Sequence, residues 1–145
     1  MVITTAMCNS FKQELLGGVH DLDTDTIKIA LIKNSQSGTY NASTANYSAV
    51  TGNSDEATGT NYVTGGNTLG SATIALSGST ATVDFADTTW SSATVSADGC
   101  IIYNSSQANK AIAVISFGGT KTSTNGDFVV QFPTADASNA IIRIA

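Results

Sequence analysis

The run Thr26-Ile-Lys-Ile-Ala-Leu-Ile-Lys33 is a β-type segment in the first quarter of the chain. Ile fits a pleated strand, and strand alternation puts Ile27, Ile29 and Leu31 on one face. The turn-like residues 21–25 precede this run, and a long polar stretch follows it. We therefore expect residues 26–33 to form the first strand of the core.

The chain after this run repeats the same kind of signal. Turn residues interrupt apolar segments about every ten residues, a spacing typical of β-sandwiches and jelly rolls. The first two segments predict a hairpin around Ser77-Gly78-Ser79, with Ile74 and Leu76 opposite Val83 and Phe85. Strands and helices do not alternate along the chain, so a parallel sheet is not expected. The expected strands span residues 68–77, 80–86, 93–96, 99–104, 111–117, 127–132 and 140–144.

The N-terminal arm, residues 1–18, carries the one helix that the sequence indicates. Ser10 and Gln13 have the spacing of a capping box, and Phe11 and Leu15 form an apolar pair one turn apart. Gly17-Gly18 ends the helix. We thus predict an all-β fold, an antiparallel sandwich or jelly-roll-like domain of about eight short strands with one short N-terminal helix.

Residues 34–61 form a long polar segment of Ser, Thr, Asn, Gly, Ala and Tyr, with only short possible strands around Tyr40 and at 47–50. A loop of this length inside a compact domain usually has a task or a partner. Tyr40, Tyr47 and Tyr62 lie in or beside it. These rings either contact a partner or sugar, or fasten the segment to the sheet, and the sequence leaves both readings open.

Size and composition limit the class of protein. The chain has 145 residues, enough for a single β domain spanning residues 1–145. Eleven acidic residues against six basic ones give a net charge of -5 without a basic cluster, so nucleic acid is not an expected partner. No apolar run is long enough for a membrane span, and we expect no membrane partner. We expect Cys8 and Cys100 to be buried free thiols.

The residues that usually carry catalysis are sparse. The one histidine, His20, follows the glycine stop and is expected to be a solvated or capping residue. Asp21, Asp23 and Asp25 resemble the start of a calcium loop, but Thr26 and Ile32 occupy the Gly and Glu positions, so only a looser cation site stays open.

Two other motifs are equally weak. Residues 118–122 lack the spacing of a phosphate loop and indicate a turn. Two of Asp84, Asp87 and Asp98 could in principle form the carboxylate pair of a glycosidase, but their spacing in the sequence gives little support to this. We predict no enzyme, no catalytic residue, no metal and no cofactor.

Several stretches together resemble a small structural protein of tailed-phage particles. The matching stretches are Thr5-Ala-Met-Cys-Asn-Ser-Phe-Lys-Gln-Glu-Leu-Leu-Gly-Gly18, Asp25-Thr-Ile-Lys-Ile-Ala-Leu31, Tyr62-Val-Thr-Gly-Gly66, Trp90-Ser-Ser-Ala-Thr94, Ile102-Tyr-Asn-Ser-Ser106 and Asn139-Ala-Ile-Ile-Arg-Ile-Ala145. They extend over nearly the whole chain. The resemblance implies a virion component made in the host cytoplasm, and within that class it is most like a capsid decoration, or cement, protein.

Such a protein would bind the outer surface of the head shell, with the major capsid protein and its own copies, as a homotrimer, as partners. A tail or neck adaptor, or a host-surface binding module of the virion, is the alternative, and a glycan-cleaving enzyme is a further rival. We expect the segment 1–7 and the helix to dock on the capsid or on a sister subunit. The candidate contact residues are Val2, Ile3, Met7, Phe11, Leu15, Tyr40, Tyr47 and Tyr62.

Overall fold

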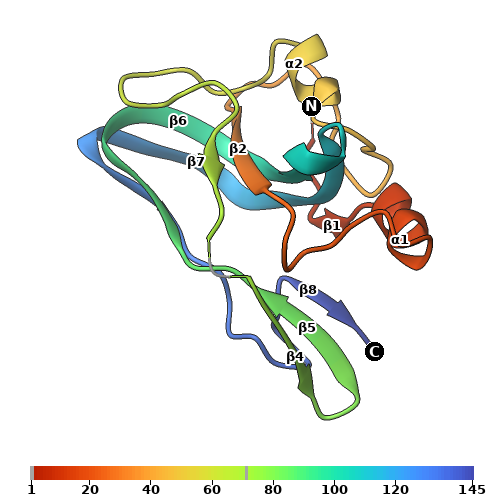
Figure 1. The fold of residues 1–145 in the computed structure, drawn as a ribbon. Helices are drawn as coiled ribbons and strands as arrows, with labels where there is room; N and C mark the ends of the chain where they lie inside the picture. Colours follow the sequence, from red (N-terminus) through yellow and green to blue (C-terminus); the bar gives the residue numbers. More distant parts are fainter. Residues whose placement is uncertain (1, 71) are drawn as a thin grey trace.

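A computed structural model describes residues 2–70 and 72–145, and it has two antiparallel sheets (Figure 1). The larger sheet has the order β1-β7-β6-β2-β3, and the smaller has the order β4-β5-β8. Ser71 of the expected strand 68–77 and Met1 of the expected docking arm lie outside the described residues. The all-β antiparallel architecture expected from the sequence is confirmed.

The larger sheet is built around β2 (Ile27–Lys33), β6 (Thr88–Asn104) and β7 (Lys110–Val130). Strand β2 pairs along most of its length with β6, and β1 (Ala6–Met7) and β3 (Asn67–Thr68) form the edges. Ile27, Ile29 and Leu31 are buried as predicted, but Ala30 and Ile32 are buried as well. Both faces of β2 are therefore covered, as in an interior strand.

Four of the expected short strands are parts of two long ones. Segments 93–96 and 99–104 belong to β6, and segments 111–117 and 127–132 belong largely to β7. The residues between them form bulges: the β6–β7 register shifts between Ala97 and Gly99. On β7, Gly118, Gly119 and Asn125 adopt positive φ. The expectation that the chain reverses at these turns was thus wrong. An extra residue at positive φ bends a strand without ending its pairing.

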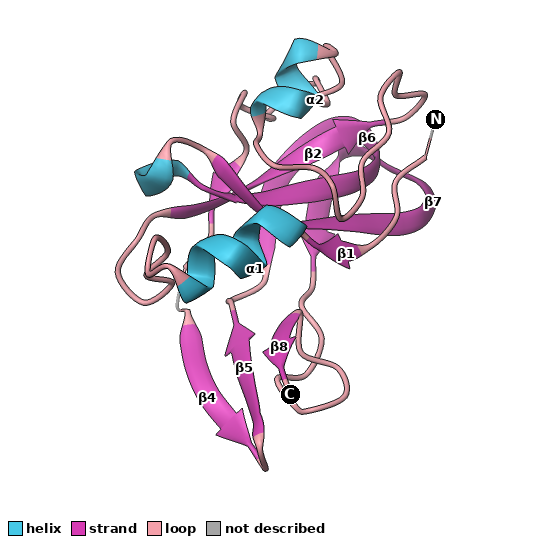
Figure 2. Cartoon of the chain, turned by 90° about the vertical axis from the view of Figure 1, so that its right-hand side faces the viewer, coloured by secondary structure: helices cyan, strands magenta, loops and turns pink. Residues whose placement is uncertain are grey.

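The smaller sheet contains β4 (Thr73–Ser77), β5 (Thr80–Asp84) and β8 (Ile142–Ile144). The predicted hairpin is confirmed, with Gly78 at φ 63 in a two-residue turn. Ile74 faces Val83, whereas Leu76 faces Ala81, and Phe85 lies beyond β5 in the core. The hairpin extends away from the larger sheet (Figure 2).

Helix α1 (Asn9–Leu16) confirms the expected N-terminal helix, but its start differs. Cys8 is the N-cap, and the buried hydroxyl of Ser10 has no hydrogen-bond partner, so the capping box was wrong. The end is as expected: Gly18 has φ 73, and Gly18 N and Val19 N donate to Leu15 O and Glu14 O. This pattern is a Schellman motif, which requires a left-handed residue at that position.

A short helix, α2 (Ser48–Gly52), lies where the sequence offered only a possible short strand at 47–50. A 3-10 turn (Ser105–Gln107) connects β6 and β7. Within the described residues, no helix is long and apolar enough to cross a membrane. One contiguous apolar cluster includes side chains of both sheets, such as Ile101 from β6 and Val83 and Ile142 from the smaller sheet.

Candidate functional site

The N-terminal arm is part of the sheet. Ala6 and Met7 pair with Val114 and Ala113 of β7, and Ile3 forms a bridge with Tyr40. Ile3 and Phe11 are buried in the core, and Met7 and Leu15 are half-buried against it. Among the candidate contact residues in this arm, Val2 is clearly exposed, at 57%. Backbone pairing and core burial therefore hold the arm on the sheet, and its docking on the capsid or on a sister subunit stays a prediction.

The segment 34–61 is fastened through a buried carboxylate, that of Asp55. Its oxygens accept hydrogen bonds from Ser37 N and Oγ, from Gly38 N at 2.7 Å and from Tyr40 Oη at 2.6 Å. Lys33 Nζ lies 3.4 Å from the same carboxylate. A buried carboxylate is tolerated only when such donors replace water. Asp55 thus ties residues 37–40 to the end of β2.

A second carboxylate, that of Glu56, fastens the other tyrosines. Tyr47 Oη and Tyr62 Oη both donate to it, the latter at 2.9 Å, and Gly65 N donates to it at 2.6 Å. Tyr62 Oη in turn accepts from Leu31 N at 2.9 Å. The ring of Tyr47 stacks on Tyr103, with centroids 4.4 Å apart. Of the two readings left open for these tyrosines, the structure supports the one in which they hold the segment on the sheet.

The titration behaviour of this network follows from its burial. Burial would raise the pKa of Asp55, but hydrogen bonds from Tyr40, Ser37 and Gly38 outweigh it and bring that pKa far below 3.8. Burial and the bond to Asp55 raise the pKa of Tyr40 to about 12. Burial, together with the nearby Glu56 carboxylate, also raises the pKa of Tyr47 and Tyr62. These groups keep one protonation state near neutral pH, as structural groups do.

His20 is buried, which corrects the expectation of a solvated residue. Its Nδ1 lies 3.0 Å from Asn104 Nδ2, and its ring packs 5.0 Å from that of Phe11. Its Nε2 lies 3.6 Å from Glu14 Oε1. Cys8 is 0% exposed and forms no disulfide.

The acidic residues 21–25 close their own turn. Asp21 Oδ1 accepts from Asp23 N and Thr24 N, and Asp25 Oδ2 accepts from Asn104 Nδ2 at 2.7 Å. The bond from Asn104 is the main cause that lowers the pKa of Asp25. In the described parts of the chain, no cluster of three or more His, Cys, Asp or Glu residues could hold a metal ion.

The other candidate carboxylates are placed in separate surroundings. Asp84 ends β5, Asp87 accepts from Phe132 N, and Asp98, further along β6, accepts from Thr120. Both cysteines are buried and free, as expected. Residues 118–122, judged a turn rather than a phosphate loop, run through a bulge of β7.

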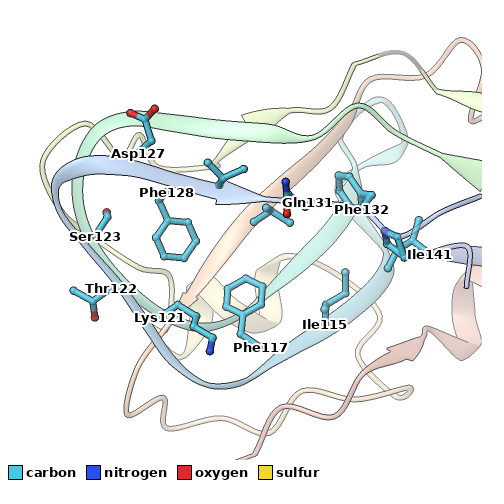
Figure 3. A pocket seen from close by; sticks show the side chains of 13 residues that line it. Ile115, Phe117, Lys121, Thr122, Ser123, Asp127, Phe128, Gln131, Phe132 and Ile141 are labelled. Carbon is cyan, nitrogen blue, oxygen red and sulfur yellow. The ribbon is translucent and has the colours of Figure 1, made fainter.

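The bend of β7 creates a groove that the sequence reading missed. Its volume is about 550 Å³, and it is lined from both halves of this one strand (Figure 3). Phe117 and Phe128 lie in it with ring centroids 6.1 Å apart, and Trp90 supports Phe128 edge-on from β6. Thr122, Ser123 and Asp127 lie at one end of the groove, and Phe132 and Ile141 at the other (Figure 3). An apolar groove with one polar end suits a partner segment that is largely apolar.

A second uncovered apolar surface belongs to the smaller sheet. Ile74, Leu76 and Ile144 are 54%, 75% and 50% exposed on one face. A hollow of about 370 Å³ separates this face from the end of α1 and the turn that follows it. Exposed apolar residues gathered in this way mark an interaction surface more often than single ones do.

No protein-family description, no curated protein and no solved structure matches the chain. What the molecule itself defines is a class: an antiparallel all-β domain with two uncovered apolar surfaces.

Proposed function

We propose that this protein is a structural component of a larger assembly and that it binds a neighbouring protein through the β7 groove. The observation that carries the proposal is the aromatic lining of the groove: Phe117 packs against Phe128, Phe132 lies at one end, and Phe117 and Phe132 keep part of their surface exposed. Aromatic side chains in a concave apolar site give much binding energy per residue. The carboxylates of Asp55 and Glu56 and the tyrosines bonded to them are engaged in holding the fold.

The assembly that we propose is a phage particle, with the protein as a capsid decoration, or cement, protein on the head shell. The support is the sequence resemblance, together with a composition in which only 12% of the chain's residues are charged and most polar residues are neutral. A cement protein stabilises a shell by mass action, because it binds the assembled lattice better than the precursor. Its partner is then the major capsid protein.

The groove indicates what the partner presents. An apolar side chain of an extended capsid segment would pack against the rings of Phe117 and Phe128, and its backbone would meet the polar groups of Thr122 and Ser123. The exposed side chain of Lys121 at the rim would favour an acidic residue next to that apolar one.

The test is cosedimentation of the purified protein with head shells that lack it. We expect Phe117→Ser to weaken shell binding by at least about tenfold, because it removes one wall of the groove. Val63→Ser, on a 71% exposed side chain away from the groove, is the matched control and should bind normally. Thermal unfolding of both variants shows whether the fold is kept. Unchanged binding by a folded Phe117→Ser protein would refute the assignment of the groove.

The number of copies per particle separates the head from the alternative, a tail or neck adaptor or a host-surface binding module. A shell protein follows the capsid lattice and is present in hundreds of copies. A tail or neck component follows the symmetry of the tail or neck and is present in about three to twelve copies.

A further inference from the structure

Strand β4 forms a free edge of the smaller sheet. It pairs with β5 on one side, and the sheet order β4-β5-β8 leaves its other side without a neighbouring strand in the described structure. The strand lies on the hairpin that extends from the larger sheet (Figure 1), and Ile74, Ala75 and Leu76 are exposed. An edge of this kind offers backbone donors and acceptors to any strand that approaches.

Most proteins protect such an edge with a charge, a proline or a bulge. Strand β4 has none of these: its register with β5 is continuous from Thr73 to Ser77, and it contains no proline. Residues 57–83 also include no charged side chain, although the whole chain carries 11 acidic and 6 basic residues. The strand itself therefore brings no like charges together when two negatively charged molecules approach along it.

The hairpin register shows which groups are directed outward. Ser77 and Thr80 close a two-residue turn, so they form a hydrogen-bonded pair, and the alternation makes Ala75 and Thr82 the next one. The N–H and C=O groups of Ile74 and Leu76 then point away from β5. These two residues also carry the exposed apolar side chains of the strand.

We propose that two copies of the protein pair through their β4 edges, antiparallel about a two-fold axis at Ala75. Ile74 then lies opposite Leu76 of the partner subunit, so each copy contributes the same two backbone and side-chain contacts. The result is a continuous six-stranded sheet whose apolar faces adjoin. This inference deepens the proposed structural role, since it names a partner within the assembly.

A two-fold axis fits this edge better than the three-fold axis expected from the resemblance. Closing a three-fold ring through this sheet pairs β4 with the other edge strand, β8, which has three residues and carries Arg143. Because β4 and β8 each lie antiparallel to β5, they are parallel to each other, and a cyclic ring would join them by parallel pairing. Antiparallel pairing is the more stable of the two, and two-fold dimers are the commonest symmetric assemblies.

A cysteine at the proposed axis tests the register. The N–H and C=O groups of Ala75 point toward β5, so the two Ala75 residues form a non-hydrogen-bonded pair across the proposed axis. In such an antiparallel pair the Cα atoms lie about 4.5 Å apart. That separation lies within the range of a disulfide. We expect Ala75→Cys to give a covalent dimer under mild oxidation, and Ser79→Cys, in the exposed hairpin turn, to give far less. Cys8 and Cys100 are buried and should not interfere. Equal cross-linking of the two variants would overturn the proposed axis.

Sedimentation equilibrium tests the edge itself. The unmodified protein should dimerise, and Leu76→Lys should weaken the dimer by about tenfold or more, since the change acts twice across a two-fold axis. Val63→Lys, at a similarly exposed apolar position elsewhere, should leave dimerisation unchanged. A monomer, or a series of larger polymers, for the unmodified protein would overturn the inference. Because Leu76 does not line the β7 groove, this failure would leave the proposed shell binding standing, and a failed Phe117 test would leave the dimer standing.

Discussion

Tyr40 Oη lies 2.6 Å from Asp55 Oδ2, and both side chains are almost fully withdrawn from solvent. This pair joins two points of a segment that has little regular structure of its own. With Lys33 Nζ at 3.4 Å from the same carboxylate, it anchors residues 37–55 to the end of β2. The long polar segment is therefore an integral part of the domain, and its contribution to stability can be tested residue by residue.

Asp55→Ala should lower the free energy of unfolding by about 3 kcal/mol, because the donors from Ser37, Gly38 and Tyr40 lose their acceptor inside the protein. Urea unfolding followed by circular dichroism measures this change. Asp23→Ala, in an exposed turn, should stay within about 0.5 kcal/mol of the unmodified protein. Equal effects of the two substitutions would contradict the role given to Asp55.

Stability should fall in acid. The pKa of Asp55 is lowered in the folded protein from an ordinary value of 3.8. A lowered folded pKa adds stability that is fully present above the unfolded value and is lost as the pH falls below it. We expect the free energy of unfolding to decrease from about pH 4 downward. In Asp55→Asn this decrease should be smaller, and an unaltered slope would exclude Asp55 as its main source.

The tyrosines should not ionise near pH 10 while the protein is folded. All four belong to the networks described above, and burial raises the pKa of each, to about 12 for Tyr40 and Tyr103. Raised folded values add stability that is present below the unfolded pKa of 10 and is lost as the pH rises through the folded one. Absorbance at about 295 nm should show no phenolate step near pH 10. A full step there, with the fold intact, would contradict the networks.

Gly66 should not tolerate a side chain. It has φ 75, and a Cβ atom there would overlap the carbonyl oxygen of Ile29 on β2. Gly66→Ala should cost at least about 2 kcal/mol of stability, measured by thermal unfolding. The control is Gly52→Ala in α2, where open space surrounds the added methyl group. That substitution should be neutral or slightly stabilising, as Ala favours a helix over Gly.

Much of the architecture could be predicted from local sequence. The Ile-rich run gives β2, and Ser77-Gly78-Ser79 gives the β4–β5 hairpin, because both depend on residues close in the chain. The merging of short strands into β6 and β7 could not be predicted. Glycine and asparagine at positive φ serve both reversals and bulges, and only the pairing partner decides between them.

The candidate site was less accessible to sequence reasoning. Phe117 and Phe128 meet only because the bulge between them bends β7, so their separation along the chain says little about their contact. Nothing in the local sequence distinguishes Asp55 and Glu56 from other loop acids, since their donors come from residues that reach them only after folding.

The most direct test of the central claim, that this protein is an assembled structural part, is its copy number in purified phage particles, measured by quantitative mass spectrometry. The account predicts hundreds of copies per particle, and density for the β domain on the head surface in particle images. Absence of the chain from mature particles would contradict the account.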